Sequence, residues 1–90
     1  MMAPPKVLIA ARNLLGLKQV EAAEIAGISR RTIQRLELGE LDRTHASILL
    51  QCSYEDQGIV FVRPKDGQGW GLIDNSQALK SGPEKPAGSP

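Results

Sequence analysis

Three arginines and two hydroxyl side chains stand together in one short stretch of this chain, and their chemistry suits the edges of DNA bases. Ser29 is followed by Arg30, Arg31 and Thr32, and Arg35 comes one helical turn later, with no acid among them. A guanidinium can donate two hydrogen bonds to guanine O6 and N7, and a threonine methyl group can contact the methyl group of thymine. We therefore regard Arg30, Arg31, Thr32 and Arg35 as candidate base readers.

Two short helices are expected to position these side chains. Ile33 and Leu36 are spaced i, i+3 and would be buried on the opposite side of a helix over about residues 30–38. Ser29 can cap the start of that helix by accepting a hydrogen bond from a free backbone N–H. A helix over about residues 18–26 precedes it, and the turn 26–29 joins the two. Such a pair can place its second helix in the major groove of DNA.

Residues 17–39 show a specific resemblance to a known protein family. The segment 17–39 resembles the helix-turn-helix family of phage Cro and cI-type repressors (the xenobiotic-response-element, or XRE, type), and the likeness extends from about residue 7 through the helix that follows residue 39. The residues that carry it are Leu17, Gln19, Ala23, Gly27, Ile28, Ser29, Ile33, Leu36, Glu37 and Gly39. The resemblance implies a mostly α, lambda-repressor-like bundle of four to five short helices. It also implies a sequence-specific transcription regulator, with a homodimeric repressor of a pseudo-palindromic operator as the default.

The resemblance also assigns roles to side chains around the two helices. Gln19 would donate to a DNA phosphate, and Arg43 would contact the backbone from the loop after the recognition helix. Lys18 stands where relatives usually carry a Ser or Thr cap, but a lysine there can reach a phosphate, and Ser29 is a further phosphate candidate. Arg12 would pair with Glu37 to fix the helices, the alternative being two unrelated surface charges. In some relatives an acidic patch contacts RNA polymerase, so polymerase is a candidate partner. A protein antagonist is a second candidate partner.

Two further helices should complete the bundle in residues 6–57. The first spans about residues 6–15 and the second about residues 43–56, while residues 1–5 form a frayed end that contains two prolines. The expected buried side chains are Val7, Ala10, Ala11, Leu14 and Leu15 in the first helix, Val20, Ala23 and Ile25 in residues 18–26, and Ile48, Leu49 and Cys52 in the last helix. Ala22 stands where relatives carry leucine, which predicts an under-filled core or a closer neighbour.

A β-hairpin is predicted after the helices, in residues 58–73. A run of β-branched and aromatic residues over 59–63 favours a strand, Asp66-Gly67 favours a hairpin turn, and residues 70–73 would return as the second strand. Because an isolated hairpin is marginal in water, it should pack on the helices or pair with a second copy. The candidate dimer-interface residues are Ile59, Phe61, Trp70 and Leu72, and the alternative is that Trp70 only covers the local core. Residues 74–90 are predicted to be a disordered tail.

Composition restricts the class of protein. The chain has 90 residues, a net charge of +1, 3% aromatic residues and one cysteine, which together predict a single small domain with an aliphatic core and no internal disulfide. No apolar run approaches the roughly 20 residues of a membrane span, and the first residues lack the pattern of a signal peptide, so a cytoplasmic protein is expected. One His, one Cys and no phosphate-binding loop argue against an enzyme, a metal site or a cofactor. The alternative function is a DNA-binding antitoxin or another protein-interaction module that also regulates its own promoter.

Overall fold

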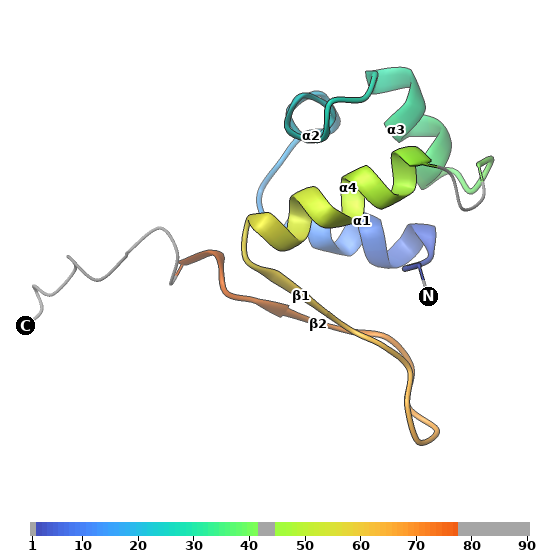
Figure 1. Ribbon diagram of the computed structural model, residues 1–90, viewed down its shortest axis with the longest axis vertical. Coiled ribbons are helices and arrows are strands. Elements are labelled where there is room, and N and C mark those ends of the chain that lie inside the picture. Colours follow the sequence, from blue (N-terminus) through green and yellow to red (C-terminus); the bar gives the residue numbers. More distant parts are fainter. Residues whose placement is uncertain (1, 42–44, 78–90) are drawn as a thin grey trace, which may run out of the picture.

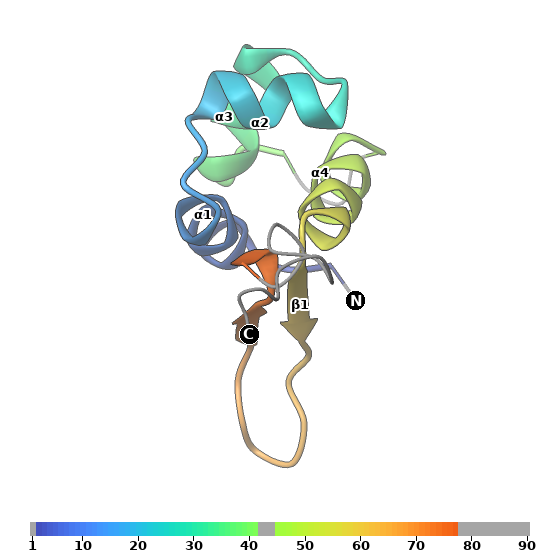
Figure 2. The ribbon, with the colours of Figure 1, turned by 90° about the vertical axis from the view of Figure 1, so that its left-hand side faces the viewer.

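Four helices and a two-stranded hairpin make up the computed structural model, which describes residues 2–41 and 45–77 (Figure 1). The helices are α1 (Pro5–Leu14), α2 (Gln19–Ala26), α3 (Arg30–Glu37) and α4 (His45–Asp56), and the strands are β1 (Ile59–Val62) and β2 (Gly71–Asp74). The mostly α bundle with a C-terminal hairpin is thus confirmed. Figures 1 and 2 place the hairpin tip at the end of the molecule opposite to α2 and α3.

Local signals in the sequence explain where α1 and α3 begin and where α2 ends. Pro5 lies in the first turn of α1, where a missing N–H costs nothing, and Gly27 ends α2 in the left-handed conformation with a φ of 73°. Ser29 Oγ accepts from the backbone N of Thr32 at 3.0 Å, which caps α3. The turn between α2 and α3 is therefore specified by its own residues.

The core is aliphatic except for one tyrosine. Its buried members are Ala3, Val7, Leu8, Ala11, Ala22, Ala23, Ala26, Ile33, Leu36, Leu50, Tyr54 and Ile59. The predicted stripes of α1 and α2 are partly wrong, because Leu14, Val20 and Ile25 are all more than 40% exposed. In α1 the buried side chains are instead Val7, Leu8 and Ala11, and α2 turns three alanines, Ala22, Ala23 and Ala26, inward.

Helix α4 turns a different face to the core from the one predicted. Its buried side chains are Ser47, Leu50, Gln51 and Tyr54, at i, i+3, i+4 and i+7, whereas Cys52 is exposed. A tertiary contact helps to select this face, because the Gln51 Oε1 atom accepts from the backbone N of Ala3 at 3.0 Å.

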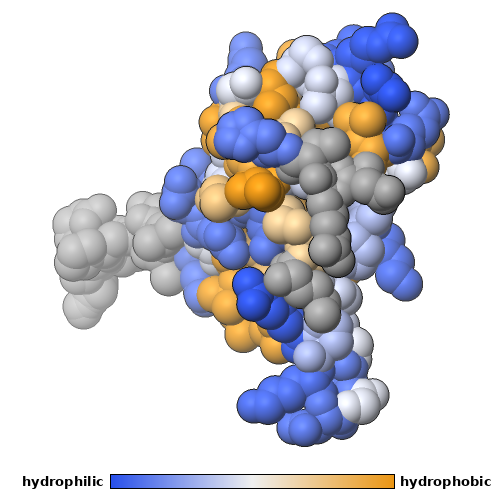
Figure 3. Space-filling model, turned by 45° about the vertical axis from the view of Figure 1, so that its right-hand side comes forward, coloured by the Kyte–Doolittle hydropathy of each residue, from blue (hydrophilic) through white to orange (hydrophobic). Residues whose placement is uncertain are grey.

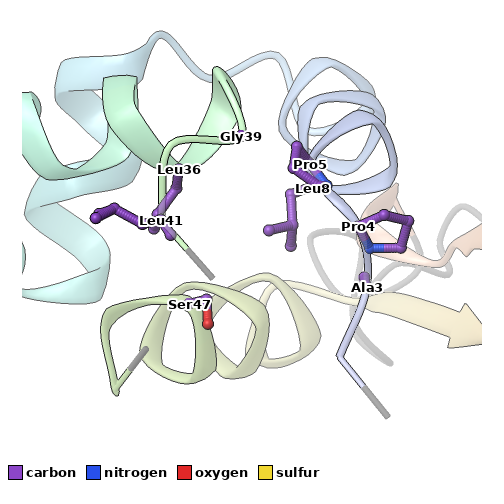
Figure 4. Close-up of a pocket in the computed structure, with 8 residues that line it drawn as sticks. All are labelled: Ala3, Pro4, Pro5, Leu8, Leu36, Gly39, Leu41 and Ser47. Carbon is purple, nitrogen blue, oxygen red and sulfur yellow. The ribbon is translucent and has the colours of Figure 1, made fainter. Parts of the chain in front are cut away.

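The same Ala3–Gln51 contact bears on the N-terminal residues, which were expected to fray. Ala3 is only 6% exposed, so this segment packs against α4. Beside it lies a mostly apolar pocket of about 430 Å³, lined by residues of the N-terminal segment, α1, the end of α3, the following loop and α4 (Figure 4). Small side chains such as Ala3 and Ser47 leave this space open.

The hairpin is antiparallel and packs against α1 and α4. Phe61 pairs with Leu72 and Val60 with Ile73, and the tip has a φ of 53° at Asp66 and 81° at Gly67, as a type I′ turn requires. The backbone N of Asn75 donates to the carbonyl oxygen of Gly58 at 2.8 Å. Residues 74–77 are therefore ordered, contrary to the predicted start of the disordered tail, and residues 78–90 lie outside the described residues.

Candidate nucleic-acid interface

Helix α3 is anchored by two apolar side chains and turns its cations to solvent. Ile33 and Leu36 are 0% and 2% exposed, whereas Arg30, Arg31 and Arg35 are exposed. At about 100° per residue, Arg30 and Arg35 lie about 140° apart around the helix axis, and Arg31 lies between them. The three guanidinium groups therefore share one face of α3, opposite the core.

Thr32 lies beside this face. It lies about 200° from Arg30 around the axis, next to the direction of the buried Leu36. Its side chain is half-buried, and its Oγ1 atom is 2.8 Å from Ser29 Oγ. In either orientation one hydroxyl of this pair donates to the other, and the second hydroxyl keeps a proton that could reach a phosphate. The Ser29–Thr32 pair is thus better placed to contact a DNA phosphate than to read a base.

A polar network holds the other end of α3. Arg12 donates from Nε to Glu37 Oε2 at 2.7 Å and from Nη2 to Glu37 Oε1 at 3.1 Å, and its Nη1 donates to the carbonyl oxygen of Leu17 at 2.9 Å. The side chains are only 16% and 6% exposed. The structure therefore brings Arg12 and Glu37 together as a nearly buried bidentate pair, which links α1 to the end of α3.

Gln19 joins the same network. Its Nε2 atom donates to Glu37 Oε1 at 2.9 Å, so the first residue of α2 is tied to the last residue of α3. An amide nitrogen carries two protons, and the second remains for a DNA phosphate. Lys18 precedes Gln19 as the helix cap, with an exposed side chain.

The backbone N of Lys18 donates to Glu21 Oε1 at 2.7 Å. Glu21 stands three residues after the cap, where a capping box places its carboxylate, and this spacing is the sequence signal for the contact. The hydrogen bond from Lys18 N to Glu21 partly compensates for the missing side-chain cap, because a lysine side chain has no acceptor. Arg43 lies outside the described residues.

Tyr54 completes the surroundings of the Arg12–Glu37 pair. Burial raises the pKa of the Tyr54 hydroxyl well above its usual value, and the Glu37 carboxylate raises it further, while Arg12 lowers it. The pKa of Arg12 is also raised, chiefly by its hydrogen bond to Glu37. The Tyr54 hydroxyl therefore stays protonated at neutral pH.

One exposed ion pair involves an arginine of the α3 face, and it is weak. Arg35 Nε lies 3.4 Å from Glu40 Oε1, with side chains 46% and 53% exposed. Such a pair contributes about 0–1 kcal/mol, so a phosphate or a base can replace Glu40 at little cost.

Across the described residues, no helix is both long and apolar enough to cross a membrane.

Not all of the predicted interface residues face outward on the hairpin. Ile59 is 2% exposed and belongs to the core, so it leaves almost no surface for the predicted dimer contact. Phe61, Trp70 and Leu72 are half-buried and pack against the core. The outward face instead carries Val60, Val62 and Ile73, which are 44%, 42% and 50% exposed. Side chains alternate between the two faces of a strand, so the exposed residues are shifted by one position from the predicted interface residues.

One comparison with known proteins identifies a family for the segment that contains these helices. A family model described as helix-turn-helix matches residues 8–52, which is half of the chain and includes α2 and α3 in full and most of α1 and α4. A comparison with curated proteins found no match.

Proposed function

We propose that this chain, which belongs to the Cro/cI-type helix-turn-helix family of DNA-binding transcription regulators, is a homodimeric repressor that reads a pseudo-palindromic operator in the major groove. The observation that carries the proposal is the face of α3. Arg30, Arg31 and Arg35 project from it, while Ile33 and Leu36 anchor the helix from behind. An exposed cationic face on a fixed helix can enter a groove without rearranging the core.

Contacts to phosphates would set the register of the helix on DNA. Lys18, Gln19 and Ser29 lie at the starts of α2 and α3, where backbone N–H groups also favour an anion. Arg43 would add a contact from the loop after α3. Each phosphate that is neutralised makes binding more salt-dependent, whereas base contacts make it more sequence-dependent. These two readouts separate the two groups of residues.

The proposal is tested by selecting bound duplexes from a random pool with the wild-type chain and two variants. The wild type should enrich a two-fold symmetric sequence with half-sites about 34 Å apart. Arg31→Ala should lose preference at particular base pairs. Lys18→Ala should weaken all sequences alike and reduce the salt slope by about 1.

Lys65→Ala is the matched control, because it removes an equal charge from the hairpin tip, away from α3. It should leave both the preference and the slope unchanged. A wild-type chain that binds all duplexes equally at moderate salt would refute sequence-specific regulation. A reporter gene placed behind the enriched sequence should be turned down by the wild-type chain, and increased expression would refute repression.

For dimerisation we propose the outward face of the hairpin, with a second copy of this chain as its occupant. Val60 and Ile73 are paired across the strands, and Val62 extends the same face. Figure 3 shows hydrophobic surface above the hydrophilic hairpin tip. A two-fold operator needs two recognition helices, and a second copy supplies the other helix while covering this apolar face. A hairpin that is marginal alone gains buried area from the same contact.

Sedimentation velocity at micromolar concentration tests this surface. Val60→Lys combined with Ile73→Lys should convert a dimer to a folded monomer, whereas Val20→Lys, which changes an equally exposed valine on α2, should remain dimeric. Point variants are preferable to truncation after Gly58, because truncation would also remove the core residue Ile59. A monomeric wild-type chain would refute the homodimer and would favour a different protein partner, as in the antitoxin alternative.

A further inference from the structure

The face of α3 that carries the arginines contains a fourth polar side chain, Gln34. Relative to Arg30, Gln34 lies about 40° around the helix axis, Arg31 about 100° and Arg35 about 140°. Gln34 is therefore inside the sector that the arginines define, whereas Thr32 is outside it. Sequence reasoning considered only cations and hydroxyls and passed over this amide.

The carboxamide of Gln34 is available for a ligand. Among the residues that the structure describes, its side chain makes no hydrogen bond. Gln19, the other glutamine beside it, has committed one donor to Glu37 at 2.9 Å. A pocket of about 380 Å³ opens here, lined by Ile9, Gln19, Gln34, Glu37 and Leu38. Gln34 thus presents a free donor and a free acceptor at the edge of a hollow on the recognition side.

The setting of Gln34 limits how many conformations it must lose on binding. Its side chain is half-buried, whereas the three arginines are exposed. A side chain that is already partly fixed loses less entropy when it is immobilised. The helix beneath it is held by the Arg12–Glu37 pair and by Gln19, so its position is defined before DNA arrives.

We propose that Gln34 is a specificity-determining residue that reads an adenine in each half-site. This inference rests on the proposed function and extends it. A carboxamide donates to adenine N7 and accepts from the N6 amino group, a pattern that no arginine can supply because a guanidinium has no acceptor. The arginines select guanine, and Gln34 adds one A·T pair between or beside the guanine contacts. The operator half-site then contains both kinds of base pair.

The test is the selection of bound duplexes, repeated with Gln34→Ala and Gln34→Glu, followed by competition binding on the wild-type sequence. Gln34→Ala should lose preference at one A·T position by about 5- to 150-fold and keep the guanine positions. Gln34→Glu should shift that same position toward cytosine, because a carboxylate accepts from cytosine N4 but cannot donate to N7. Gln57→Ala, at an exposed glutamine after α4, is the matched control and should change nothing.

The outcomes separate this inference from the proposed function. If the wild type shows no sequence preference, the proposed function itself fails. If the wild type shows preference and Gln34→Ala keeps every position of it, the role of Gln34 is overturned. An equal loss of affinity on all duplexes would assign Gln34 to the phosphate backbone and would overturn it as well. Circular dichroism of each variant checks that α3 remains folded.

Discussion

Replacing Glu37 with glutamine tests whether the polar network at the end of α3 supports the domain. The change keeps the shape of the side chain but leaves the Arg12 guanidinium, only 16% exposed, without its counterion. Removing one partner of a buried ion pair costs about 3–5 kcal/mol, and we expect about 3 kcal/mol because Arg12 keeps some contact with water and with the carbonyl oxygen of Leu17. The free energy of unfolding of a 90-residue domain is roughly 5–13 kcal/mol, so this loss is large.

Urea unfolding followed by far-ultraviolet circular dichroism measures the effect. A loss of about 3 kcal/mol lowers the midpoint by roughly 1–3 M urea. The chain supplies its own control in Glu40→Gln, which removes the exposed partner of Arg35 and should cost at most about 1 kcal/mol. If Glu37→Gln costs no more than Glu40→Gln, Arg12 and Glu37 act as unrelated surface charges and the reasoning is refuted.

A double variant separates the pair from the penalty of breaking it. Arg12→Met with Glu37→Met removes both charges and fills the space with apolar atoms, so its stability should be closer to the wild type than that of Glu37→Gln. A double variant that loses as much as the sum of the two single variants would show that the two residues act independently.

Two further changes probe the core and the start of the hairpin. The raised pKa of Tyr54 means that the unfolded chain releases its proton first as the pH rises through about 10, so stability should fall by up to about 1.4 kcal/mol per pH unit above that point. Tyr54→Phe should remove this part of the fall in urea midpoint, and an unchanged alkaline slope would contradict the assignment. Gly58→Ala should cost more than about 1 kcal/mol, because the φ is 109° and a Cβ would lie 2.9 Å from the backbone of Ser76. Gly69→Ala, where a Cβ meets nothing within 4 Å, is its control in the same urea titration, and equal midpoints would refute the steric argument.

The features that the sequence predicts well are those specified by neighbouring residues. The Ser29 cap, the left-handed Gly27 and the Asp66-Gly67 turn each depend on contacts within a few positions. The resemblance over residues 17–39 adds the anchoring pattern of Ile33 and Leu36. The two helices and the hairpin could therefore be placed to within a few residues.

The features that sequence reasoning missed depend on distant partners. Helix α4 contains apolar residues on more than one side, and neither set is favoured by spacing alone. The contact between Gln51 and the backbone of Ala3 spans 48 positions and helps to decide which side is buried. The hairpin was predicted correctly as an element. Both of its faces carry apolar side chains, however, so the spacing alone did not show that the face with Ile59 meets α1 and α4.

The orientation of the recognition helix depends on polar contacts because its apolar anchor is small. Helix α3 buries two large side chains, Ile33 and Leu36, worth roughly 3–6 kcal/mol together, and α2 meets it with alanines. Such a contact fixes the distance between the helices better than the rotation of α3 about its axis. The Glu37 carboxylate, held by donors from Arg12 and Gln19, restricts that rotation from the far end of the helix. The direction in which Arg31 and Gln34 point therefore depends on residues that contact no base themselves.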